Sequence, residues 1–149
     1  MKKLLLILSV LIIASCKKDS VTPTPASTNP STTTSSTTAE TFDPSKATLL
    51  KQGTLTGINH TASGTVKVYD ANGSKTVYFE TFSSQDGPDL KVYLSKDIDA
   101  KDYIKLGVLK STSGMQSYAV PATTDVVPYT YVHIWCEKFT VVFARAEIK

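Results

Sequence analysis

Turn signals recur through the last two thirds of the chain and leave room only for short elements. They are Gly57, Asn72-Gly73, Asp86-Gly87-Pro88, Gly114 and Pro128. The segments between them alternate apolar and polar residues and are rich in β-branched and aromatic side chains, which is the pattern of half-buried strands. No window carries the apolar stripe of an amphipathic helix, although Asp97–Tyr103 has room for one helical turn. The sequence therefore predicts an all-β domain.

Seven segments after the first turn have strand character. Asn72-Gly73, between the first two, is the strongest short hairpin signal, and Glu137-Lys138 joins the last two. We expect an antiparallel β-sandwich of about eight short strands, with a closed barrel as the alternative. The expected strands are Thr65–Asp70, Lys75–Phe82, Asp89–Leu94, Ile104–Leu109, Met115–Val120, Tyr129–Cys136 and Phe139–Ile148.

Residues 1–15 have the features of a bacterial lipoprotein signal peptide. Two lysines precede an apolar run that is too short to span a bilayer, which takes about 20 apolar residues. The run ends Ile13-Ala14-Ser15-Cys16, which resembles the lipobox. We therefore expect cleavage before Cys16, a thioether-linked diacylglycerol on its sulfur and acylation of the new amino terminus. An ordinary secretory signal that ends in a cysteine is the alternative.

Residues 16–44 combine this lipidation site with a linker. The 22 residues from Ser20 to Thr41 contain 5 Ser, 9 Thr and 3 Pro. Such a segment buries too little apolar surface to offset its ordering entropy, so we expect a disordered tether. It would hold the globular domain, residues 45–149, off a membrane in the cell envelope. Because Lys17 rather than an aspartate follows Cys16, we expect the outer membrane, facing the periplasm or the surface.

Charge argues against nucleic acid as a partner. Residues 45–149 carry 12 basic and 10 acidic side chains, and the basic ones are scattered singly. A phosphate-binding surface needs several clustered cations. We therefore expect no nucleic-acid binding.

The cysteine count singles out Cys136. If Cys16 carries lipid, Cys136 has no intramolecular partner in an oxidising compartment. Strand parity places Val132, Ile134 and Cys136 on one face and His133 on the other, so His133 is badly placed to activate the thiol. A small, inert core side chain is the competing interpretation of Cys136.

Familiar catalytic and metal sites do not fit the spacing of the candidate residues. The chain has no C-x-x-C pair for thioredoxin-like chemistry or covalent haem attachment, and no histidine or methionine follows Cys136 as a blue-copper site requires. Three N/S ligands in the domain are too few for structural zinc. We expect no metal site and found no catalytic set that would make the chain an enzyme. Noncovalent haem with Cys136 as axial ligand stays open.

Four blocks of residues occur in a specific order over nearly the whole globular region. They are Gly53-x3-Gly57-x2-His60-x3-Gly64; Phe82 with Gly87-Pro88-Asp89-Leu90-x-Val92-Tyr93-Leu94; Leu106-Gly107-x-Leu109-Lys110 with Gly114-x-Gln116-x-Tyr118-x-Val120-Pro121; and Val132-x-Ile134-Trp135-Cys136-x2-Phe139-x-Val141-x-Phe143-x2-Ala146. Together they resemble the DM-thirteen (electron transfer) domain, a β-rich extracytoplasmic module. The resemblance implies electron transfer with Cys136 as the redox centre, as a bare thiol or as a ligand to a group such as haem.

The resemblance also carries His60 over as a possible cofactor-binding residue, with a histidine that simply ends a strand as the equal alternative. Two functions follow. The first is a membrane-anchored lipoprotein that passes electrons, or senses redox state, through Cys136, with a separate redox protein at the membrane as its donor. The second is a tethered, non-catalytic binding or adhesion module.

Overall fold

The computed structural model describes residues 42–149. The expected signal peptide, the lipidated Cys16 and nearly all of the linker lie outside these residues. The described part begins with a short 3-10 helix and continues as eight strands. The elements are η1 (Pro44–Lys46), β1 (Thr48–Gly57), β2 (Ala62–Ala71), β3 (Ser74–Ser84), β4 (Leu90–Ser95), β5 (Tyr103–Val108), β6 (Ser113–Ala119), β7 (Tyr131–Cys136) and β8 (Val141–Glu147).

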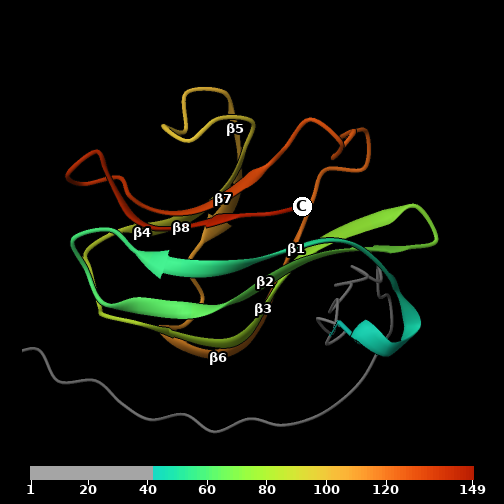
Figure 1. The fold of residues 1–149 in the computed structure, drawn as a ribbon, viewed down its shortest axis with the longest axis horizontal. Coiled ribbons are helices and arrows are strands. Elements are labelled where there is room, and N and C mark those ends of the chain that lie inside the picture. The colour runs from blue at the N-terminus through green and yellow to red at the C-terminus, as the bar shows by residue number, and fades with distance from the viewer. Residues whose placement is uncertain (1–41) are drawn as a thin grey trace, which may run out of the picture. The chain divides into compact units, whose positions relative to one another are not determined.

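All eight strands belong to one antiparallel sheet in the order β5-β4-β7-β8-β1-β2-β3-β6. The sheet folds back on itself, so that β4, β7 and β8 face β1, β2, β3 and β6 across one core (Figure 1). The edge strands β5 and β6 approach each other without pairing, which leaves a nearly closed barrel with one open seam. The expected all-β antiparallel fold of about eight strands is confirmed.

Both expected hairpins are present. Asn72 and Gly73 have φ values of 53° and 87° between the paired residues Ala71 and Ser74, which is the type I′ geometry that this dipeptide favours. β7 and β8 pair through the turn that contains Glu137 and Lys138. Asp97–Tyr103, which has room for one helical turn, forms a single hydrogen-bonded turn from the Asp97 carbonyl to the Ala100 N–H and does not continue as a helix. The carboxylate of Asp97 accepts backbone N–H groups of Asp99, Lys101 and Asp102, which fixes an irregular turn in place of a helix.

The core lies between the two halves of the sheet and takes one residue in two from each central strand. In β4 and β7 the inward residues are Leu90, Val92, Leu94, Val132, Ile134 and Cys136, as their parity predicts. Phe79 and Phe82 of β3 and Phe143 of β8 fill the centre. No helix among residues 42–149 is long and apolar enough to cross a membrane.

Candidate functional site

Cys136 is the last residue of β7, and its side chain lies in the core. Its register partners are Leu90 of β4 and Val141 of β8, and the residue is 1 % exposed. Among the described residues it is a free cysteine. Cys136 shares its face of the strand with Val132 and Ile134, as parity predicts, and this face is the inward one. Burial leaves the sulfur no direct contact with solvent.

A loop of five residues, 85–89, covers the sulfur. Cys136 Sγ donates a hydrogen bond to the carbonyl oxygen of Pro88 at 3.0 Å. Asp89, with φ 63°, reverses the chain at the end of the loop, and its carbonyl accepts the backbone N–H of Glu137 at 3.1 Å. Donation to a neutral carbonyl requires the protonated thiol, so the loop and the S–H group hold each other in place.

Gly87 allows this loop to pack closely. A Cβ on Gly87 would lie 3.0 Å from Cε2 of Phe143 and 3.1 Å from Cδ2 of Leu90. Both distances are shorter than ordinary carbon contacts. A larger residue at position 87 would therefore require the loop, Phe143 or Leu90 to shift by a few tenths of an ångström.

The same loop also lines a surface pocket. The pocket has a volume of about 270 Å³ and lies between this loop and the connection from β5 to β6. Asp86, Gly87, Asp89 and Leu90 form one wall, and residues 108–112 form the other. One loop thus separates this pocket from the thiol.

His60 lies at the same end of the domain as Cys136. It follows β1, and its ring stacks on Phe143 with a centroid distance of 3.8 Å and an interplanar angle of 7°. Phe143 in turn lies against Gly87 of the loop. The structure therefore connects His60 to the thiol through a phenylalanine ring and a loop, and it records no direct contact between the two residues.

These surroundings can be tested against haem, the group that the resemblance raises. An axial ligand needs an open approach to its sulfur. Here the Pro88 carbonyl and core side chains occupy that approach, and the neighbouring pocket is small. Cys136 in this conformation does not fit as a haem ligand. Among residues 42–149 no three His, Cys, Asp or Glu side chains gather as metal ligands would.

His133 is the second buried polar group of β7. It faces away from the core, but the 96–102 turn folds over it and leaves it with no exposed surface. Its Nε2 lies 3.3 Å from the Asp97 carbonyl oxygen, and its Nδ1 has no hydrogen-bond partner. Burial lowers the pKa of His133, so the ring is held neutral.

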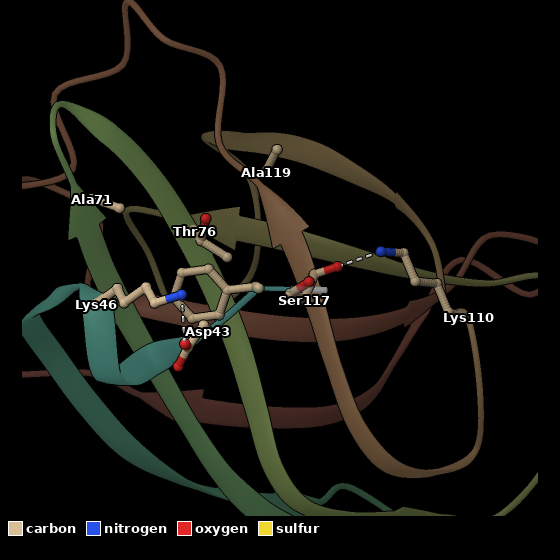
Figure 2. A pocket seen from close by; sticks show the side chains of 8 residues that line it. Asp43, Lys46, Ala71, Thr76, Lys110, Ser117 and Ala119 are labelled. Carbon is tan, nitrogen blue, oxygen red and sulfur yellow. Dashed lines mark hydrogen bonds and ion pairs between the residues drawn. The ribbon is translucent and has the colours of Figure 1, made fainter. Parts of the chain in front are cut away.

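A larger pocket lies on the outside of β3 and β6, close to the first described residue. It has a volume of about 550 Å³, and Thr76, Ser117 and Ala119 form its floor. In Figure 2, Lys46 and Asp43 approach it from one side and Lys110 from the other. Lys46 pairs with Asp43 at 3.4 Å, and Lys110 donates to the Ser117 carbonyl.

Sequence reasoning missed the role of the 85–89 loop and of Phe143. It interpreted Asp86-Gly87-Pro88 as a turn, which is correct locally, since the N–H of Gly87 donates to the Asp86 carboxylate at 2.8 Å. The sequence signal that could have indicated this role is Gly87-Pro88, directly before the strand that pairs with the Cys136 strand. The register that places Leu90 opposite Cys136 was not readable from local pattern.

Comparison with known proteins bears on the whole of this region. A family model described as "Electron transfer DM13" matches residues 54–148, more than half of the chain. The match includes His60, the 85–89 loop, Phe143 and Cys136. No curated protein and no solved structure matches the chain. On the strength of the family match, this chain belongs to the electron transfer DM13 family.

Proposed function

We propose that the protein is a lipid-anchored, extracytoplasmic electron-transfer module whose redox group is the Cys136 thiol. Cys16 would hold it at the outer membrane, and the linker would let the domain reach a separate redox protein. The family supports electron transfer in general terms. The observation that carries the assignment to Cys136 is the single loop between its sulfur and a surface pocket.

Residues 85–89 form a cover that can open and expose the Cys136 thiol. Residues 85–89 have no strand pairing, and their attachment consists of a few hydrogen bonds to neighbouring groups. Segments with few such bonds open at a lower free energy than central strands. Opening this loop would bring Sγ to the wall of the 270 Å³ pocket without unfolding the sheet.

The proposed reaction is thiol–disulfide exchange with the redox partner. With the loop open, the Cys136 thiol loses its proton and its sulfur bonds to one sulfur of a partner disulfide. The partner S–S bond breaks, and the displaced thiolate takes up a proton. Cys136 is thereby oxidised and the partner sulfur reduced, so atoms and electrons balance.

Labelling kinetics test this function. The full-length protein in detergent is treated with a maleimide, and Cys136 labelling is followed in native buffer and at increasing urea. We expect labelling whose opening free energy is well below the free energy of global unfolding. Absorption spectra of the natively purified protein check at the same time for a bound chromophore.

A matched control is a cysteine in the same core but away from the loop. Ala146→Cys in a Cys136→Ser background supplies it, because Ala146 of β8 is also buried and pairs with Val132, four residues before Cys136 in β7. This control should label only through global unfolding. If Cys136 labels at the same rate as the control, the thiol is structural and the redox proposal fails.

The pocket of Figure 2 favours a second function, the tethered binding module. Two lysines, Lys46 and Lys110, border a floor with the hydroxyl groups of Thr76 and Ser117, which is a suitable lining for a polar saccharide. Glycan-array binding that survives Cys136→Ser and is lost in Thr76→Arg would support it. Binding unchanged by Thr76→Arg would place the ligand elsewhere.

A further inference from the structure

Three aromatic rings form a continuous stack on the outer face of β4, β5 and β7. Tyr93 of β4 lies against Tyr103 of β5, with ring centroids 4.1 Å apart and planes at 11°. On the other side it lies against Trp135 of β7, at 5.9 Å and 20°. Tyr103 is 45 % exposed, Tyr93 is 3 % exposed and Trp135 is partly exposed, so the stack connects the buried ring of Tyr93 to solvent through Tyr103. Trp135 is also the chain neighbour of Cys136.

Strand parity and register build this stack. Tyr93 and Trp135 alternate with core residues and therefore point outward together. In the register of β4 and β7, Lys91 opposes Trp135 and Tyr93 opposes His133, so Tyr93 and Trp135 are diagonal neighbours. Aromatic side chains reach each other across such diagonals.

The hydroxyl of Tyr93 has a carboxylate as its partner. It donates to Glu137 Oε1 at 2.6 Å, a short bond of the charge-assisted kind. Lys105 Nζ donates to the same oxygen at 2.7 Å, and Lys91 Nζ lies 4.0 Å from Oε2 while it pairs with Asp89. These contacts hold the pKa of Glu137 below its usual range. Burial and the Glu137 charge raise the pKa of Tyr93, so the resting pair is a phenol and a carboxylate.

Tyr118 provides a comparison within the same chain. It is equally buried, at 3 % exposed, and its hydroxyl donates a bond of the same length, 2.6 Å. Its acceptor, however, is the neutral side-chain oxygen of Gln116. Among residues 42–149, Tyr93 is the tyrosine whose hydroxyl donates to a carboxylate.

This difference decides which tyrosine gives up an electron most easily. A phenol that loses an electron becomes a strong acid, and its oxidation is favourable only if the proton leaves at the same time. A base must lie within about 2.6–3.2 Å to accept it. Glu137 meets this requirement for Tyr93, whereas an amide oxygen cannot serve Tyr118 as a base.

We propose that Tyr93 is a redox-active residue that loses an electron through Tyr103 to a one-electron oxidant carried by a partner protein, with Glu137 as the proton acceptor. The electron leaves the phenol ring, the O–H proton moves to Glu137 Oε1, and the products are a neutral tyrosyl radical and a neutral carboxylic acid. Reduction returns one electron and moves the same proton back. The inference rests on the electron-transfer role proposed above, but it does not require that the thiol be exposed.

Photochemical oxidation tests the proposal. Full-length protein in detergent is flashed with ruthenium tris-bipyridine and a sacrificial quencher, so that ruthenium(III) is the oxidant. The radical is identified by electron paramagnetic resonance after rapid freezing. We expect a tyrosyl signal that Tyr93→Phe removes and Tyr118→Phe retains. Both substitutions preserve the ring, and equal thermal melts confirm that both variants are folded.

The proton acceptor is tested by Glu137→Gln, which keeps the shape and removes the base. We expect the rate of Tyr93 oxidation to fall about 100-fold, the lower end of what a positioned base contributes. The wild-type rate should also be slower in D2O, and this isotope effect should disappear in the variant. Glu147→Gln, which alters an exposed carboxylate paired with Lys149, is the matched control.

Two results would overturn the proposal: a radical that Tyr93→Phe reduces no more than Tyr118→Phe does, or an unchanged rate in Glu137→Gln. The same measurements in Cys136→Ser separate this inference from the proposed function. If the Tyr93 radical persists in Cys136→Ser and the thiol of the wild-type protein labels only on unfolding, the redox role of Tyr93 stands and that of Cys136 fails. If the wild-type thiol labels through local opening but no Tyr93 radical forms, the redox role of Tyr93 fails and that of Cys136 stands.

Discussion

Replacing Gly87 by alanine tests how the 85–89 loop protects Cys136. The added Cβ would meet Phe143 Cε2 at 3.0 Å and Leu90 Cδ2 at 3.1 Å. Because both side chains are packed in the core, we expect the loop to give way before they do. Overpacking costs about 1–3 kcal/mol, and the stiffer unfolded chain returns about 0.4–1 kcal/mol. We expect the closed loop to lose about 1–2 kcal/mol.

The assay is maleimide labelling of Cys136 in native buffer. A loss of about 1–2 kcal/mol shifts a two-state ratio by a factor of about 5–30, so Gly87→Ala should speed labelling by that factor. The substitution destabilises the closed loop, in which Sγ donates a hydrogen bond to the Pro88 carbonyl. Near-UV circular dichroism confirms that the rest of the core is unchanged.

Gly73→Ala is the control. Gly73 lies in the hairpin at the opposite end of β3, where φ is +87° and an added Cβ meets nothing within 4 Å. Alanine there strains the turn and lowers global stability by about 1 kcal/mol without touching the loop. If the loop opens locally, Gly73→Ala leaves native labelling unchanged. Equal acceleration in both variants, or none in Gly87→Ala, would refute the reasoning.

Three further predictions concern His133, Cys136 and Cys16. Because burial lowers the pKa of His133 in the folded state, the free energy of unfolding should be constant above about pH 6.5 and fall by up to about 1.4 kcal/mol per pH unit below it. Urea midpoints measured from pH 8 to 5 should show this decline, and His133→Leu should lack it. An equal decline in that variant would contradict the assignment to His133. Cys136→Ser should cost about 1–2 kcal/mol in urea denaturation if the residue only packs and caps Pro88; a neutral result would argue against that packing. Cys16→Ala should move the protein from the detergent phase to the aqueous phase in Triton X-114 partitioning, and unchanged partitioning would argue against the lipid anchor.

Local chemistry made several parts of this protein predictable from the sequence. Asn72-Gly73 adopts positive φ at both positions at little cost, so its hairpin could be identified without a structure. The alternation in Tyr131–Cys136 predicted that Cys136 shares a face with Val132 and Ile134, because successive strand side chains point to opposite faces. β1 was missed because the more buried positions of its second half are Lys51, Gly53, Leu55 and Gly57, so that burial alternates but the sequence shows no apolar alternation.

The contacts of the candidate site depend on tertiary structure. The pairing of Leu90 with Cys136 and of Tyr93 with His133 is a matter of register between strands that are far apart in sequence. The hydrogen bond from Cys136 to Pro88, 48 residues away, and the one from Tyr93 to Glu137, 44 residues away, exist only after that register forms. Sequence alone thus determined the fold class, the strand face that Cys136 shares with Val132 and Ile134, and the family resemblance. Cross-strand packing decided that the thiol is covered and that an aromatic stack leads to solvent, because register depends on the whole sheet and not on any one segment.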